Sequence, residues 1–179
     1  MKLETERLIL RELNETDVEG MFELDSNPKV HTYLGSHQTI QKREDAAKII
    51  EIVKRQYQEN GIGRWAVIEK ESGDFVGWSG LKLEKGLPNY SPYYDLGYRF
   101  IPKFWGKGYA TETAKFALKF GFLELNLNQI NATAQEANIA SNKVIQKVGF
   151  QFIETFQFEN ITTNWYGLKK EDWVKTEDK

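Results

Sequence analysis

Hydrophobic positions along the chain repeat with two spacings, one typical of strands and the other typical of helices. Apolar residues alternate with polar ones, or form short runs, in the segments that we predict as strands: 6–13, 64–69, 75–83, 95–101, 129–134, 150–158 and 162–168. A polar turn over residues 71–74 joins the second and third of these segments as a hairpin. Gly77 and Gly80 lie inside a predicted strand, which indicates that another group packs closely against it.

Apolar residues three and four positions apart predict four helices, and short polar signals predict where these helices begin and end. Asn14 followed by Asp17 has the spacing of a capping box for a first short helix, which Asn27-Pro28 ends. Thr39 is the expected N-cap of a second helix, and Asn60-Gly61 is its expected end. The apolar stripe of this second helix comprises Ala46, Ile49, Ile50, Val53 and Tyr57. Two further helices are predicted over residues 111–122 and 138–148.

The order of these elements predicts a single mixed α/β domain over residues 1–179, with hairpins in place of a strict strand–helix–strand repeat. A chain of 179 residues is long enough for one sizeable hydrophobic core. The sequence contains no internal repeat, low-complexity segment or evident linker, so we expect no second domain.

Composition and charge narrow the possible functions. A net charge of -2 gives no general attraction to nucleic acid, so we expect no nucleic-acid partner. The absence of cysteine excludes disulfides, thiolate zinc sites and a cysteine nucleophile, and two histidines are too few for a histidine-rich metal site. No apolar stretch approaches ~18 residues and the first residues lack the features of a signal peptide, so we expect a cytoplasmic protein without membrane contact.

One stretch, residues 95–122, combines a predicted strand, a glycine turn and the start of a helix. Backbone N–H groups at a helix start are unpaired and the helix dipole there favours negative charge, so this order predicts an anion site. Gly106 and Gly108 allow the backbone to approach a ligand closely. The alternative is an ordinary strand-to-helix connection that contains glycine, and the pattern alone does not decide between the two.

A second stretch, residues 138–150, places a hydroxyl group on the apolar face of a predicted helix. Ser141 shares this face with Val144, Ile145 and Val148, and an inward-facing hydroxyl needs a hydrogen-bond partner. A bond to a carbonyl one turn back would satisfy Ser141 without any function. Asn138 has a similarly simple explanation as the N-cap of the helix.

The order of the two stretches is informative: a strand, the W-G-K-G-Y-A turn, a helix, a strand and an N-x-x-S helix that ends in K-x-G-F. This series resembles the GNAT superfamily of N-acetyltransferases, and within it the RimJ/RimL-type group, which acetylates the N-termini of ribosomal proteins. The resemblance covers nearly the whole chain. The stretches that carry it are ETERLILREL, IGRWAVIEKESGDFVGWSGL, DLGYRFIPKFWGKGYATE, NIASNKVIQKVGF and NWYGLKKEDW.

The resemblance implies a mixed, mostly antiparallel sheet with a splayed central strand and helices on both faces. It implies direct transfer of an acetyl group from acetyl-CoA to a primary amine, on a protein N-terminus or a small molecule, in a ternary complex without a metal. Members of the group often form dimers, so a homodimer is possible. The alternative is a non-catalytic module that binds acyl-CoA as a sensor or scaffold. A dinucleotide-binding domain is disfavoured, because the full G-x-G-x-x-G motif is absent.

The resemblance also implies which residues hold the coenzyme. The family's pyrophosphate loop follows the pattern [QR]-x-x-G-x-[GA], which Gly108 and Ala110 match, whereas Trp105 stands where Gln or Arg is usual. Main-chain groups of Phe100 and Ile101 would pair with pantetheine, and Asn138 would contact the coenzyme arm. The main-chain N–H groups expected around the pyrophosphate belong to Gly106, Lys107, Gly108, Tyr109, Ala110 and Thr111. Lysines expected near phosphates, or else simply solvated, are Lys107, Lys143 and Lys147.

The catalytic residues follow from the same resemblance. Many members use a tyrosine as the acid at the position that Ile145 occupies here, so the usual acid is missing. Ser141 matches the serine proposed instead in the ribosomal-protein group, as an acid or as a hydrogen-bond donor to the thiolate. Asp95 is a candidate base for the amine, or else a solvated acid at a strand end. Aromatic residues that could line an acceptor groove, or merely fill the core, are Tyr33, Trp78, Tyr94, Tyr98 and Trp165.

Overall fold

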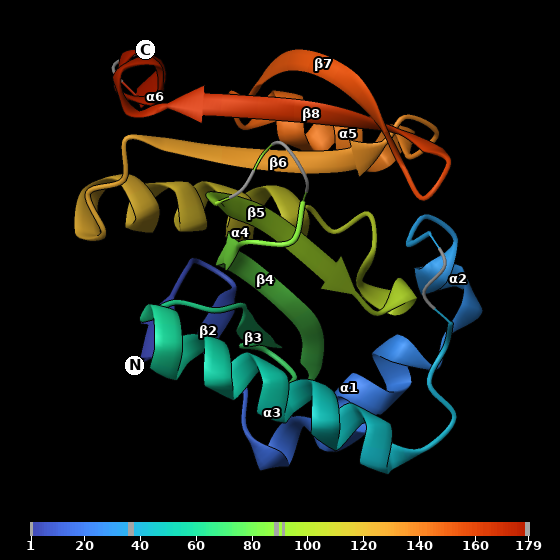
Figure 1. The fold of residues 1–179 in the computed structure, drawn as a ribbon. Helices are drawn as coiled ribbons and strands as arrows, with labels where there is room; N and C mark the ends of the chain where they lie inside the picture. Colours follow the sequence, from blue (N-terminus) through green and yellow to red (C-terminus); the bar gives the residue numbers. More distant parts are fainter. Residues whose placement is uncertain (1, 36–37, 88–89, 91, 178–179) are drawn as a thin grey trace.

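The computed structural model describes residues 2–35, 38–87, 90 and 92–177, and its centre is one eight-stranded sheet (Figure 1). The strand order is β1-β2-β3-β4-β5-β6-β8-β7, and every neighbouring pair is antiparallel except β5 and β6. The strands are β1 Lys2–Glu4, β2 Leu8–Glu12, β3 Trp65–Glu69, β4 Phe75–Glu84, β5 Tyr93–Phe100, β6 Gln129–Gln135, β7 Gln151–Phe158 and β8 Ile161–Lys169. The predicted hairpin of residues 64–83 is confirmed.

Helices cover both faces of the sheet, with α1 and α3 on one face and α4 and α5 on the other (Figure 1). The helices are η1 Glu15–Asp17, α1 Val18–Asp25, α2 Pro28–His31, α3 Arg43–Asn60, η2 Pro102–Phe104, α4 Tyr109–Lys119, the π-helical turn η3 Phe120–Glu124, α5 Ile139–Lys147 and α6 Lys170–Glu177. The predicted fold class is therefore confirmed. Within the described part of the chain, no helix is both long and apolar enough to cross a bilayer.

The capping signals of the first two helices had different outcomes. Asn14 and Asp17 form the predicted capping box: the Asp17 carboxylate accepts from the Asn14 N–H at 2.9 Å, although the capped turn is η1, directly before α1. The prediction that Thr39 caps the second helix is wrong, because α3 begins at Arg43. The Thr39 hydroxyl instead accepts from the Gln41 side chain at 3.1 Å, in a local turn that competes with helix initiation.

Helix α3 packs and ends as its sequence predicts. Ala46, Ile50 and Val53 are buried on the predicted stripe, and Gly61 ends the helix in the left-handed conformation with φ of 69°. A residue with a Cβ is strained in this conformation, which is why glycine follows the last helical residue.

Two glycines in β4 mark close contacts between strands, as their positions in the sequence indicated. A Cβ on Gly77 would overlap the carbonyl oxygen of Arg99 on β5, and one on Gly80 would lie 2.8 Å from the Trp65 ring. Both glycines also have positive φ. The packing of β4 against β5 and against Trp65 on β3 therefore depends on the absence of side chains at these positions.

Strands β5 and β6 separate, which confirms the predicted splay. They share a single parallel pairing, Asp95 opposite Asn131, whereas β5 pairs with β4 over its whole length and β6 pairs with β8 over its whole length. Each half of the sheet, one ending in β5 and the other in β6, is therefore continuously paired. A wedge opens between β5 and β6 beyond Asp95.

We predict that Gly77→Ala lowers the free energy of unfolding by roughly 2–4 kcal/mol, from overlap with the Arg99 carbonyl and from backbone strain. Gly73 is a matched control, since its φ of 76° is also positive but no atom lies near its Cβ position. Gly73→Ala should cost only about 1–2 kcal/mol of backbone strain. Urea denaturation measures both, and equal losses would contradict the steric explanation.

Candidate active site

The wedge between β5 and β6 contains a pocket of about 130 Å³. Its two strand walls are residues 96–98 of β5 and 133–135 of β6, and α5 closes it from one side. The remaining lining residues are Tyr33, Leu34, Ala114, Asn138, Ser141, Val144, Ile145 and Val148. Because neither strand wall is paired with the other, the wedge can admit an extended ligand that bonds to the main chain.

The predicted glycine turn directly precedes α4, which begins two residues earlier than expected, at Tyr109. Gly108 is its N-cap, in the left-handed conformation with φ of 83°. The first intrahelical hydrogen bond runs from the Glu112 N–H to the Gly108 carbonyl at 3.1 Å, so the N–H groups of residues 109–111 precede it. The N-cap position supplies no side-chain hydrogen bond to them. These N–H groups and the helix dipole have the arrangement that an anion site needs.

Arg7 and Glu112 brace this turn from outside the predicted motif. The Arg7 guanidinium contacts the Glu112 carboxylate at 2.6 Å and donates to the Lys107 carbonyl at 2.9 Å. Thr5 also donates to Glu112, at 2.5 Å. No local pattern indicates this role for Glu112, because its partners lie more than a hundred residues away in the chain.

Glu69, at the end of β3, holds the other side of the turn. Its carboxylate accepts from the Tyr109 hydroxyl, from Ser72 at 2.8 Å and from the Lys107 ammonium at 3.1 Å. The Tyr109 hydrogen bond, followed by those of Ser72 and Lys107, lowers the pKa of Glu69 to about 2. The same bond raises the pKa of Tyr109 to about 12. Lys107 therefore lies beside the anion site, in a fixed position and already partnered.

The main-chain groups predicted to pair with pantetheine are engaged within the protein. The Phe100 carbonyl accepts from the Trp105 indole N–H at 2.7 Å, and the Ile101 N–H donates to Val76 at 2.9 Å. The Ile101 carbonyl accepts from the Phe104 N–H at 2.9 Å. The expectation of free main-chain groups therefore does not hold for the Phe100 carbonyl or for either main-chain group of Ile101. For the Phe100 carbonyl the cause is Trp105, which stands at the position where Gln or Arg is usual and donates its indole N–H back to the strand.

Ser141 lies in the pocket, and its hydroxyl partner is on the opposite wall. The Tyr98 hydroxyl donates to the Ser141 Oγ at 3.3 Å, across from β5 to α5. Asn138 caps α5, because its side chain accepts from the Ser141 N–H at 3.1 Å, and it also lines the pocket. Its structural and ligand-binding explanations are thus compatible.

Asn142, which the sequence analysis missed, fixes α5 against the sheet. It is buried, donates to the carbonyls of Asn138 and Gln135 at 2.8 and 2.9 Å, and accepts from the Tyr166 hydroxyl at 2.7 Å. The sequence did contain a signal for this role: Asn142 directly follows Ser141 and lies four residues after the N-cap Asn138. Through these bonds, Asn142 fixes the position of α5 and therefore the position of Ser141 in the pocket.

Comparison with known proteins identifies the family. The family model described as Acetyltransferase (GNAT) domain matches residues 7–151. The chain is a GNAT acetyltransferase. It is 32% identical over 174 residues to the uncharacterized N-acetyltransferase YoaA of Bacillus subtilis, with 94% of this chain and 96% of YoaA covered. It is also similar to the crystal structure of a GNAT-family acetyltransferase from Bacillus anthracis, with 28% identity, a TM-score of 0.77 and coverage of 96% and 99%.

Two more distant structures share the fold alone. One is spermidine N-acetyltransferase from Vibrio cholerae in complex with CoA and spermine, 17% identical, with a TM-score of 0.77 and coverage of 95% of this chain and 99% of that chain. The other is ribosomal-protein-S5-alanine acetyltransferase from Vibrio fischeri, 16% identical, also with a TM-score of 0.77 and coverage of 97% and 98%. Their names specify different acceptors at equal structural similarity, so the GNAT fold does not determine the acceptor.

Asp95 occupies the closed end of the wedge in this GNAT domain and does not line the pocket. It is buried and forms an ion pair with Arg64, whose guanidinium also donates to the carbonyls of Gly80 and Asp95. Burial raises the pKa of the Asp95 carboxyl, and the Arg64 charge opposes that shift. The alternative considered from sequence, that Asp95 is a solvated acid at a strand end, is therefore wrong, because Asp95 is buried.

The other nominated residues divide between the pocket and elsewhere. Tyr33 and Tyr98 line the pocket, whereas Trp78 lies on the opposite face of the sheet beside Arg64 and Arg99. Trp165 packs against Tyr90 and Tyr93, and Tyr94 packs against the hydrophobic core. Lys143 is exposed on α5. The structure therefore brings Ser141, Asn138 and Tyr98 together in one pocket. The pocket adjoins β5, the strand that precedes the glycine turn.

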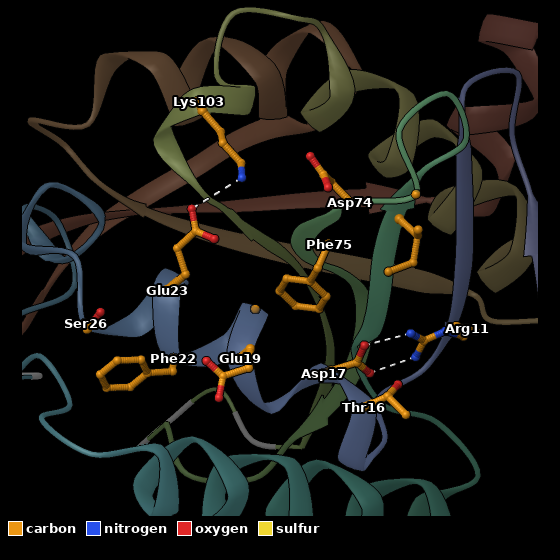
Figure 2. A pocket seen from close by; sticks show the side chains of 13 residues that line it. Arg11, Thr16, Asp17, Glu19, Phe22, Glu23, Ser26, Asp74, Phe75 and Lys103 are labelled. Carbon is orange, nitrogen blue, oxygen red and sulfur yellow. Dashed lines mark hydrogen bonds and ion pairs between the residues drawn. The ribbon is translucent and has the colours of Figure 1, made fainter.

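A larger open groove of about 680 Å³ lies beside α1 and the β3–β4 turn (Figure 2). None of the nominated site residues lines it. Its Asp17 is paired with Arg11 at 2.7 Å and its Glu23 with Lys103 at 3.5 Å, so much of its charge is already balanced. Among the residues that the structure describes, no group of three or more carboxylate or histidine side chains could hold a metal ion. We therefore assign the chemistry to the wedge.

We predict that Glu69→Gln destabilises the protein in a pH-dependent way. The pKa of Glu69 in the folded protein, about 2, lies below its ordinary value of 4.5, so its ionised form stabilises the folded state. This contribution is complete above pH 4.5 and declines as the pH falls from 4.5 towards 2. Thermal unfolding of wild type and variant across that range should show their difference shrinking with acid. A pH-independent difference, or an equal effect of Glu71→Gln at an exposed neighbouring position, would contradict this prediction.

Proposed function

We propose that the protein transfers the acetyl group of acetyl-CoA directly to a primary amine while both substrates are bound. The observation that carries this proposal is the arrangement of the wedge, which begins at the Asp95–Asn131 pairing and holds Ser141 in its pocket. The glycine turn and the uncapped start of α4 follow the same strand. Direct transfer also agrees with the lack of cysteine, because no thiol is available to carry the acetyl group.

The residues present fit acetyl-CoA in size and in chemistry. The N–H groups of residues 109–111, with Lys107 beside them, suit a pyrophosphate, and the unpaired edge of residues 96–98 suits the amide groups of pantetheine. A pocket of about 130 Å³ has room for the acetyl thioester end. Asn138 lines the pocket and would contact the coenzyme arm, and Lys143 remains a candidate phosphate neighbour on α5.

In this proposal each pocket residue has a limited task. Ser141 donates a hydrogen bond to the departing sulfur, which stabilises the developing negative charge. Asp95 has no proton-transfer role, because it is buried against Arg64 at the closed end of the wedge. It instead balances the Arg64 charge and keeps β4 and β5 together.

The acceptor class that fits the pocket best is an amine with a single charge, such as a protein N-terminus. The described residues that line the pocket include no Asp, Glu, Lys or Arg. A polyamine carries several positive charges and would need carboxylates near the entrance, because burying an unpaired charge is costly. The uncharged lining favours acetylation of the RimJ/RimL type over polyamine acetylation. A homodimer stays a prediction.

An acceptor screen separates the enzyme from the non-catalytic coenzyme-binding module. Release of CoA from acetyl-CoA would be followed with peptides that begin like ribosomal proteins and with spermidine. Acetylation of the peptides in preference to spermidine supports the proposed acceptor class. Coenzyme binding without turnover on any amine would favour the sensor or scaffold.

We predict that acetyl-CoA raises the melting temperature and that Gly108→Val abolishes most of this rise. Binding to the native state stabilises it by about 2.7 kcal/mol at a hundred times the dissociation constant. A valine at Gly108, where φ is 83°, would distort the turn and place a side chain next to the anion site. Gly61→Val is the control, since Gly61 has φ of 69° at the far end of α3. No shift for wild type at millimolar acetyl-CoA, or equal shifts for wild type and Gly108→Val, would contradict the assigned site.

A further inference from the structure

Tyr98 brings a second hydroxyl group into the pocket, from the β5 wall of the wedge. No residue of this wall has so far been given a role in proton transfer. Its ring is stacked on Phe100, with 5.5 Å between the centroids, and is half-buried along β5. Its hydroxyl, however, points across the wedge and donates to the Ser141 Oγ at 3.3 Å. A tyrosine that only filled the core would not need its polar end in the pocket.

We propose that Tyr98 is the acid of the acetyl-transfer reaction and that it supplies a proton to the departing sulfur through Ser141. This inference rests on the proposed acetyl-CoA site. It assigns Ser141 the role of a relay between the phenol and the sulfur.

Acidity is the first argument for Tyr98. A phenol has an ordinary pKa near 10 and a thiol one near 8.5, so proton transfer between them is only mildly uphill. A serine hydroxyl is a far weaker acid and cannot supply the proton unaided. Burial raises the pKa of Tyr98, so the phenol carries its proton at neutral pH.

The direction of the hydrogen bond is the second argument. The phenol is the stronger acid and donates to the serine oxygen, which leaves the serine hydrogen free to point at a sulfur in the pocket. As the new C–N bond forms and the C–S bond breaks, sulfur takes the Ser141 proton and Ser141 takes the Tyr98 proton. The phenolate regains a proton from solvent, which receives the one that the amine nitrogen loses, so the protons balance.

The surroundings of Tyr98 contain no competing charge. Among the described lining residues the only other titratable side chain is Tyr33, which is 41% exposed. The lining residues from α4, α5 and β6 are apolar or neutral. Arg99, next along β5, pairs with Asp25 at 2.6 Å and stacks beside Trp78, which places it on the other face of the sheet.

The test measures the pKa of the thiol of bound CoA, from the ultraviolet absorbance of the thiolate, and therefore needs no acceptor. The variants are Tyr98→Phe, Ser141→Ala and the double variant. Tyr94→Phe is the matched control, because Tyr94 lies four residues earlier on the same face of β5. Hydrogen-bond donors favour the thiolate, so we expect each single change at Tyr98 or Ser141 to raise the thiol pKa by roughly half a unit to one unit.

Turnover with spermidine or with an alanine-starting peptide supplies a second readout. We expect Tyr98→Phe and Ser141→Ala each to lower turnover by roughly a hundredfold, and the double variant to lose no more than the worse single one, because a relay fails as a unit. Affinity for CoA and the behaviour of Tyr94→Phe should remain close to wild type.

The assignment would be overturned if Tyr98→Phe kept the wild-type thiol pKa and the wild-type turnover. It would also be overturned if Tyr94→Phe lost as much turnover as Tyr98→Phe, because this result would indicate an effect of packing. Additive losses in the double variant would overturn the relay. Failure of the wild-type protein to bind CoA at all would instead overturn the proposed function, and the two failures are thus distinguishable.

Discussion

The single pairing of Asp95 with Asn131 is the constraint on which the rest of the site depends. A strand that leaves one neighbour exposes main-chain groups that need partners, so β5 must be held firmly by its other neighbour, β4. Arg64 strengthens that side at the closed end of the wedge, since its guanidinium donates to the carbonyls of Gly80 on β4 and Asp95 on β5. Gly97 is part of the same arrangement, because a Cβ there would lie 2.7 Å from the Arg64 Nη2.

The glycine turn is held in a comparable way, by charges that come from distant parts of the chain. Arg7 and Glu112 brace one side, and Glu69 holds Lys107 and Tyr109 on the other. Because Arg7 and Lys107 are 44% and 45% exposed, each ion pair contributes roughly 0–1 kcal/mol to stability. Their main effect is geometric: they fix the turn without capping the N–H groups at the start of α4, which receive no side-chain hydrogen bond from the N-cap.

Local chemistry could be predicted from sequence, and contacts between distant residues could not. The Asn14–Asp17 capping box, the Gly61 helix end and the left-handed Gly108 follow from preferences within a few residues. The place of Ser141 in the pocket followed from helical spacing. The errors have long-range or competing causes: Arg64 encloses Asp95, the Trp105 ring takes the Phe100 carbonyl, and a side chain two residues away occupies the Thr39 hydroxyl.

The difference between local patterns and long-range contacts also explains why the family's usual acid position does not reveal the acid in this chain. The resemblance to the family identifies that position as Ile145 on α5, where a hydrocarbon side chain cannot give a proton. Ile145 and Tyr98 nevertheless line one pocket from different walls, α5 and β5. The reaction requires an acidic hydrogen at a point in space and does not require it from a particular element. A pattern along one helix cannot reveal a donor that arrives from the facing strand, whereas the contact between Tyr98 and Ser141 does.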